Sequence, residues 1–435
     1  MVLLVGLAVV FFVRGGVTRF ATDMANDAIL QRRYESAESW LSFAQRTFGN
    51  QAQVEFLLGR LDRINGDFDG MLNHFHKAHD LGFDGKKLNR EQVLANLSLG
   101  EMDAATEGMA RGWIAELPDD IGMIVDSYAN GLASQSRFEE ASNLLEEYEK
   151  AFPNDAMVNF RFGVMSEHIL ENARAEQEYL KALEKAPGFV QAAWRLARIR
   201  SGQNKPQEAI EILTKIDHGR QALAVKTYLA HCFQQAGDLE KSSELLRAVA
   251  DKGYQATLPA YRAVDEVPER FLAASELGVL CVKLGNWEDA KKYLEMALEV
   301  NQRDFIARNS YGQVLRRLGM HEQAEKELAR IVEERKEYDK ITALRDQINQ
   351  NQDNTAARVE MGKILFKYES ERLGLFWIRS ALTYDPKCHD AHQFLGEYYA
   401  KKSEQASSTG EKQLFENKAS YHLAQIASTS TPVLP

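Results

Sequence analysis

The feature that most constrains this chain is a pattern that recurs every 34 residues along most of its length. Within residues 156–189, the strings "MVNFRFGVMSEHIL" and "AEQEYLKALEKAP" both space their apolar residues as one face of an α-helix does. Equivalent segments begin at residues 122, 156 and 190, at 271 and 305, and at 355 and 389. Because such a period is typical of two-helix units that stack on one another, the sequence predicts an elongated, all-helical array.

Within one unit, the second helix is predicted to pack closely against the first. Ala175, Tyr179 and Ala182 fall on one stripe of this helix, and charged residues surround the stripe. Small residues on a buried stripe allow a neighbouring helix to approach, and Gly163 supplies one in the preceding helix. Pro187 is expected to end the second helix, because proline lacks an N–H and disfavours helix at the residue before it.

The same register continues through strings such as "LGRLDRINGDF", "LGVLCVKLGNWEDAKKYLEMAL" and "YGQVLRRLGMHEQAEKEL". Their small residues, turn glycines and later alanines resemble the tetratricopeptide repeat (TPR) family. The resemblance implies an all-α, right-handed superhelical solenoid of about 10 to 11 helix-turn-helix units. The residues before the repeats add the expectation of an apolar helix at the N-terminus. The chain also has a short apolar start, a unit "FLLGRLDRINGDFDGMLNHFHKAHDLG" and a final "DPKCHDAHQFLGEYYAKK". More narrowly, this layout resembles membrane-anchored TPR proteins of planctomycete-type bacteria.

The repeat spacing also predicts where the regular array is interrupted. Residues 86–119 form a degenerate unit, and surplus residues around "ATLPAYRAVDEVPER" and "KEYDKITALRDQINQ" are expected to hold extra helical turns. The predicted parts are a membrane anchor or signal segment 1–17, a TPR block 18–254, an insertion 255–270, a TPR pair 271–335, a helical insertion 336–354, a TPR pair 355–427 and a disordered tail 428–435.

Composition and motifs argue against several functional classes. The formal net charge of −10, without a concentrated basic stripe, argues against binding to nucleic acid. Cys232, Cys281 and Cys388 lie far apart without a C-x-x-C pair, so neither a disulfide framework nor a structural zinc site is indicated. Phosphate-binding loops, G-x-S-x-G elbows and H-E-x-x-H motifs are absent from the sequence. Since the repeats leave no room for a catalytic domain, we expect neither enzymatic activity nor a cofactor.

Two histidine groups are the remaining candidates for metal binding. The string "NHFHKAH" contains His74, His76 and His79, and "KCHDAH" places His389 and His392 one helical turn apart. The alternative is that His392 packs between helices while the other histidines lie on the surface. We favour this alternative and predict no metal site, although a metal-binding or enzymatic protein that uses the insertions remains a competing hypothesis.

The chain begins with the apolar string "VLLVGLAVVFFV", which is followed by Arg14 and Arg19. A membrane-spanning helix needs about 20 residues, and the core of a signal peptide needs about 7 to 15. Because no basic segment precedes the string and no small-x-small site follows it, we expect a membrane anchor whose true start could lie upstream of Met1. A cleaved signal and a buried first helix are the alternatives. We expect the repeats on the periplasmic side, whereas the arginines after the string would favour the cytoplasmic side.

The TPR resemblance implies that the first helix of each unit lines a concave groove, with its fifth and ninth positions facing a bound partner. The candidate partner-binding residues at these positions are Phe56, Arg60, Asp126, Asn130, Phe160, Trp194, Arg198, His231, Asn309, Gln313 and Lys363.

The aromatic residues at the fifth position are the strongest candidates for contact with a partner. Phe56 and Trp194 are each followed one turn later by an arginine, which is a composition typical of binding hot spots. The alternative is that Phe56, Phe160 and Trp194 are core residues between adjacent helices. Asp126 stands before Asn130 where a clamp for a C-terminal carboxylate would have lysine, so no such clamp is expected. The sequence predicts a membrane-anchored scaffold for a protein or peptide partner, with a structural part of an envelope assembly as the alternative.

Overall fold

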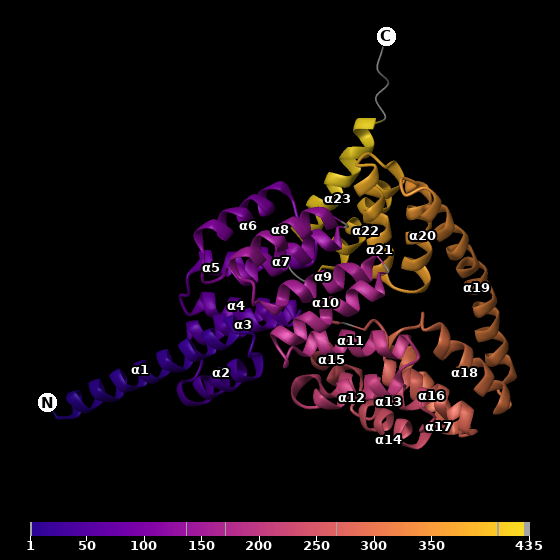
Figure 1. Cartoon of the computed structure of the whole chain (residues 1–435), viewed down its shortest axis with the longest axis horizontal. Helices are drawn as coiled ribbons and strands as arrows, with labels where there is room; N and C mark the ends of the chain where they lie inside the picture. The colour runs from indigo at the N-terminus through magenta and orange to yellow at the C-terminus, as the bar shows by residue number, and fades with distance from the viewer. Residues whose placement is uncertain (1, 136, 170, 267, 407–408, 430–435) are drawn as a thin grey trace, which may run out of the picture. The chain divides into compact units, whose positions relative to one another are not determined.

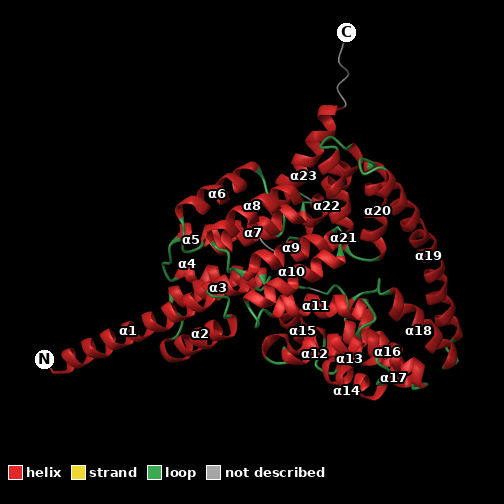
Figure 2. Cartoon of the chain, viewed as in Figure 1, coloured by secondary structure: helices red, strands yellow, loops and turns green. Residues whose placement is uncertain are grey.

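The computed structural model describes residues 2–135, 137–169, 171–266, 268–406 and 409–429. Over these residues the chain forms α-helices and one short 3-10 helix, without any β-strand (Figure 2). The expectation of an all-α fold is therefore confirmed. The helices separate into two compact units. Residues 1–134 with 138–268 form unit 1, and residues 135–137 with 269–435 form unit 2.

Unit 1 is a succession of helices that mostly pack as consecutive pairs, labelled in Figure 1. They are α1 (Val2–Leu30), α2 (Tyr34–Phe48), α3 (Ala52–Ile64), α4 (Phe68–Asp80), α5 (Gly85–Ser98), α6 (Ala104–Glu116), α7 (Ile121–Ser134), α8 (Phe138–Ala151), α9 (Ala156–His168), α10 (Asn172–Lys185), α11 (Val190–Gly202), α12 (Pro206–Lys215), η1 (Gly219–Gln221), α13 (Ala222–Gln235), α14 (Leu239–Ala250) and α15 (Tyr254–Arg262).

Glycine in the first helix of a pair allows the second helix to come close. A Cβ added to Gly163 would lie 2.4 Å from a ring carbon of Tyr179, and a Cβ added to Gly59 would lie 2.4 Å from a ring carbon of Phe75. Any larger residue at these two positions would therefore collide with an aromatic ring. Tyr179 is fully buried, as the stripe on α10 predicts, and α10 ends at Lys185, two residues before the proline expected to end it.

The first helix contradicts the membrane anchor predicted at residues 1–17. α1 continues without a break to Leu30, and its C-terminal half packs against α2 with Ala21 and Ile29 buried. Across the described part of the chain, we find no helix with the length and apolar character that crossing a bilayer requires. The apolar string is interrupted by Arg14 before it reaches the roughly 20 residues of a span. The expectations of a membrane anchor and of a periplasmic location that depended on it are therefore wrong.

The insertion predicted at residues 255–270 contains the short helix α15, which packs against α13 and η1. Pro259 lies inside this helix of nine residues, where its missing N–H removes one hydrogen bond of the helix. Ala260, Tyr261 and Val264 are buried, so the insertion contributes to the core of unit 1.

Unit 2 consists of further helices, again packed mostly in consecutive pairs. They are α16 (Leu272–Leu284), α17 (Trp287–Val300), α18 (Phe305–Arg317), α19 (His321–Gln350), α20 (Thr355–Tyr368), α21 (Glu371–Tyr384), α22 (His389–Gln405) and α23 (Thr409–Thr429).

The structure shows how three predicted parts of the chain are built. The helical insertion 336–354 is helical as far as Gln350, where it forms the end of α19, one uninterrupted helix of 30 residues. The degenerate unit 86–119 holds the helices α5 and α6. The disordered tail was predicted from residue 428, but α23 extends to Thr429. Residues 430–435 of that tail lie outside the described residues.

Candidate interaction site

Ion pairs connect successive first helices of unit 1. Four of these hydrogen-bonded pairs join residues that are 28 to 35 positions apart, so each links one helix pair to the next. The pairs form two groups, one around α3 and α5 and the other around α9 and α11. The two groups differ in burial and in where their carboxylates come from.

The first group, the Glu91 cluster, consists of Arg60 and Arg63 of α3, Arg90 and Glu91 of α5, and Asp120 just before α7. Arg60 Nε donates to Glu91 Oε1 at 2.9 Å, and Arg63 Nε donates to Glu91 Oε2 at 2.7 Å. Asp120 accepts from Arg60 at 3.3 Å and from Arg90 at 2.5 Å. The Glu91 side chain is 0 % exposed, so its negative charge depends on Arg60 and Arg63.

Glu91 stays ionised despite its burial. Burial by itself raises the pKa of this carboxyl, but the charges and hydrogen bonds of Arg60 and Arg63 outweigh it and lower the pKa to about 2. A buried carboxylate held by two buried arginines acts as a permanent link between α3 and α5, because removal of Glu91 would leave two buried guanidinium groups without the carboxylate that they share.

The second group contains Arg161 of α9 and Arg195 and Arg198 of α11, which we call the arginine triad. Arg161 Nε donates to Asp126 Oδ1 of α7 at 2.6 Å. Arg195 Nη1 donates to Glu167 Oε2 of α9 at 2.8 Å. These two pairs position Arg161 and Arg195 through contacts from neighbouring first helices.

Further partners of the arginine triad come from the turn after α15. Arg161 Nη1 donates to Asp265 Oδ2 at 3.3 Å, and Arg195 Nη2 donates to the main-chain carbonyl oxygen of Asp265 at 3.4 Å. Arg198 forms an ion pair with the Glu266 carboxylate, across 68 positions of sequence. We call Asp265 and Glu266 the acidic turn. Arg198, predicted to contact a partner protein, is thus bound by another segment of its own chain.

The backbone of the acidic turn is fixed by the end of α15. The Asp265 N–H donates to the Arg262 carbonyl oxygen, and the Glu266 N–H donates to the Tyr261 carbonyl oxygen, both at 3.0 Å. This is the hydrogen-bond pattern of a Schellman motif, which needs one residue in the left-handed region. Asp265 supplies it with φ of 59°, a conformation that aspartate tolerates better than most side chains. The two adjacent carboxylates therefore leave the helix end from a defined backbone.

The three aromatic residues predicted as hot spots are buried. Their burial agrees with the alternative that they are core residues between adjacent helices. They are Phe56, Phe160 and Trp194, with exposed fractions of 2 to 4 %. Phe56 stacks on Phe83 with 4.4 Å between ring centroids. Trp194 meets the ring of Tyr261 edge to face, with 6.3 Å between centroids. Trp194 is thus covered by α15, the same helix that carries the acidic turn.

Two other predicted residues of unit 1 are half-buried beside this network. Asn130 accepts from Arg161 at 3.1 Å and donates to the Ser98 carbonyl oxygen at 2.9 Å. His231 of α13 stacks on Tyr228, with 5.3 Å between ring centroids. Asn130 and Asp126 are therefore direct neighbours of the arginine triad, which itself contains the predicted residue Arg198.

The remaining predicted residues belong to unit 2. Asn309 is half-buried and Gln313 is exposed on α18, and Lys363 is exposed on α20. The network around the arginine triad consists of unit 1 residues and does not include these three positions. Their role in binding a partner stays a prediction.

The histidine strings do not gather metal ligands in the described part of the chain. His392 is buried, its Nδ1 lies 2.9 Å from Nδ1 of His422, and its Nε2 lies 2.9 Å from the Pro386 carbonyl oxygen. His389 is exposed beside Asp390. His392 thus packs between α22 and α23 while its sequence neighbour faces water.

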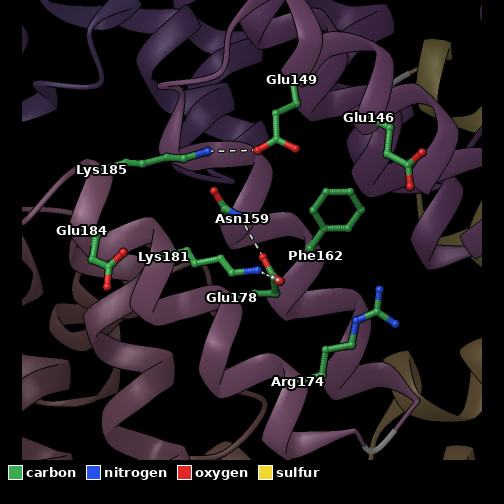
Figure 3. A pocket seen from close by; sticks show the side chains of 9 residues that line it. All are labelled: Glu146, Glu149, Asn159, Phe162, Arg174, Glu178, Lys181, Glu184 and Lys185. Carbon is green, nitrogen blue, oxygen red and sulfur yellow. Dashed lines mark hydrogen bonds and ion pairs between the residues drawn. The ribbon is translucent and has the colours of Figure 1, made fainter.

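A surface pocket between α8, α9 and α10 is a weaker candidate site (Figure 3). Charged residues of both signs line it, namely Glu146, Glu149, Arg174, Glu178, Lys181, Glu184 and Lys185. Lys181 donates to Glu178 at 2.7 Å and Lys185 donates to Glu149 at 3.0 Å, so several of these charges already neutralise one another. Ligand pockets are usually lined mainly by apolar side chains, and here Phe162 is the aromatic exception.

Two residues of the arginine triad are not among the predicted partner-binding residues, although they stand at equivalent positions of two successive repeats. Arg161 and Arg195 lie 34 residues apart, and each directly follows an aromatic residue of the prediction. The repeat register could therefore have found both. The acidic turn carries no comparable signal, because its contact with the arginine triad depends on how α15 packs.

Comparison with known proteins agrees with the helical-repeat architecture. Residues 129–188 and 275–339 match the sequence profile of the tetratricopeptide repeat. No curated protein sequence matches the chain, so the narrower resemblance to planctomycete-type proteins stays a prediction.

Solved structures of similar fold include the yeast Tom70, at 15% identity and TM-score 0.33, with 97% of this chain and 98% of that chain covered. They also include the human IFIT1 dimer with m7Gppp-AAAA, at 12% identity and TM-score 0.42, with 95% of each chain covered. A third is the APC/C hetero-tetramer Cut9-Hcn1, at 13% identity and TM-score 0.38, with 90% of this chain and 88% of that chain covered. Each of these TM-scores lies below 0.5, so none of the three likenesses carries an argument about this chain.

Proposed function

We propose, for this tetratricopeptide-repeat-type helical protein, a non-catalytic role as a scaffold that binds a protein segment on the first helices of unit 1. The observation that carries the proposal is that Arg161, Arg195 and Arg198 already hold a distant segment of the same chain. A face that accommodates one helix end with complementary charge has the chemistry to accommodate another.

The chemistry of the arginine triad supports recognition rather than catalysis. Arginine presents several N–H donors in a planar fork and stays charged at all physiological pH values, which suits the binding of carboxylates. Arg198 is 41% exposed, so part of the arginine triad is accessible to a partner. Complementary charge at such a site contributes specificity and association rate more than raw affinity.

Site-specific photo-crosslinking in the organism that makes the protein tests this proposal. A photo-reactive residue at His231, a predicted partner-facing position on α13, should form adducts with a defined partner protein. The matched control places the same photo-reactive residue at Glu244, an exposed position on α14, the second helix of the same pair. We expect adducts from position 231 and few from position 244.

Equal adducts from both positions, or none from either, would count against a partner-binding face on the first helices. An absence of adducts would favour the alternative of a structural component without a separate ligand.

A further inference from the structure

The contact between the acidic turn and the arginine triad has the form of a ligand bound in its site. We propose that the arginine triad is a binding site for a partner helix that ends in two adjacent acidic residues, and that the acidic turn is its internal competitor. This inference rests on the proposed scaffold function and adds the chemical class of the partner and a mode of control.

The arginine triad keeps its shape without the acidic turn. When Asp265 leaves, Arg161 still donates to Asp126 and Asn130. Arg195 likewise still donates to Glu167. These side-chain pairs fix two of the three guanidinium groups, so the site is preorganised for a new carboxylate. A partner therefore does not have to immobilise these two arginine side chains when it binds.

The acidic turn is held more loosely than a structural ion pair of the core. The side chain of Asp265 is 44% exposed, and that of its partner Arg161 is 12% exposed. Arg198 is 41% exposed and Glu266 is 22% exposed. Ion pairs with this much access to water contribute about 1 kcal/mol or less and are weakened by salt, so a competing carboxylate can replace them.

The occupant also indicates what a partner would look like. Tyr261, the next-to-last residue of α15, packs against Trp194, and the two side-chain carboxylates follow four and five positions later. The carboxylates belong to side chains inside the chain, and no C-terminal carboxylate takes part. An amphipathic helix with an acidic C-terminal turn therefore fits the site, whereas a free C-terminus is not required.

Binding of a synthetic peptide to the full chain tests the proposal. The peptide is "YQATLPAYRAVDEVP", residues 254–268, with both ends blocked so that only side-chain carboxylates are present. We expect it to bind the double variant Asp265→Asn, Glu266→Gln about tenfold more tightly than the unaltered chain, because the internal competitor then holds the arginine triad without its two negative charges. Fluorescence anisotropy of a labelled peptide measures both affinities.

Two controls separate the charge effect from folding and from non-specific contact. A peptide with Asn and Gln in place of its two acidic residues should lose binding to the double variant. Adding Arg198→Gln to the double variant should also weaken binding of the acidic peptide severalfold, while circular dichroism shows an unchanged helical fold.

Equal affinity of the acidic peptide for the unaltered chain and the double variant would overturn the internal competitor. Equal binding of the neutral peptide would overturn the carboxylate site, and so would a failure of the acidic peptide to bind the folded double variant. Partner adducts at position 231 together with any of these outcomes would leave the scaffold function standing and remove only this inference.

Discussion

The Glu91 cluster and the arginine triad use the same chemistry in opposite ways. Both join first helices of unit 1 through arginine and carboxylate groups. In the Glu91 cluster the central carboxylate is fully buried and belongs to the repeat itself. The arginine triad binds the carboxylates of Asp265 and Glu266, which are partly exposed and belong to the turn after α15. Burial and origin of the carboxylate, rather than the type of ion pair, therefore distinguish a structural link from an exchangeable contact.

The largest expected effect is the loss of stability on substitution of the buried carboxylate. Glu91→Gln keeps the shape of the side chain but leaves Arg60 and Arg63 without their shared negative charge. Removing one partner of a buried ion pair costs about 3–5 kcal/mol, so we expect a decrease of this size in the free energy of unfolding. Urea denaturation followed by circular dichroism measures it.

The matched control is Glu266→Gln, which removes a carboxylate of the same type from the acidic turn. Because its nearest partner Arg198 is 41% exposed and its second partner Arg195 lies 3.8 Å away and keeps Glu167, we expect a decrease of about 1 kcal/mol or less. Equal losses in the two variants would break the distinction between the two groups.

A smaller effect is expected from acid. The pKa of Glu91 is lowered from 4.5 to about 2 in the folded chain, so this group adds stability above the unfolded-state value and loses that contribution as the pH falls toward 2. The stability difference between the unaltered chain and Glu91→Gln should therefore shrink progressively below about pH 4.5. Urea midpoints at neutral pH and at several values below 4.5 measure the difference. A constant difference across this range would show that Glu91 is not held ionised by Arg60 and Arg63.

The repeat pattern predicted the parts of the fold that depend on neighbouring residues. Gly163 and Tyr179 lie 16 positions apart within one unit, and their close contact follows from helix period and residue size. The continuous helix α19 was harder to predict from the sequence. A helix that runs on past the end of a repeat looks like an insertion when only the repeat period is considered. The apolar N-terminal string was misread for a related reason, since its continuation as α1 into the core of unit 1 depends on packing against α2.

The candidate site was predictable only in part. Periodicity directed attention to Trp194 and Arg198, and both lie where α15 meets α11. Whether Trp194 faces a partner or the core depended on α15, whose position a local pattern does not encode. The Glu266 carboxylate reaches Arg198 across 68 residues, and such a pairing follows from tertiary packing alone.

Hydrogen exchange of the full chain tests most directly whether the acidic turn is exchangeable while the Glu91 cluster is permanent. The Glu266 N–H is held by the Tyr261 carbonyl oxygen, so its exchange reports on opening of the acidic turn. We predict faster exchange in residues 263–266 than in α5 around Glu91, and a further increase at 263–266, but not in α5, when the blocked acidic peptide is added in excess. Exchange at 263–266 that is as slow as in α5 and unaffected by the peptide would contradict the account.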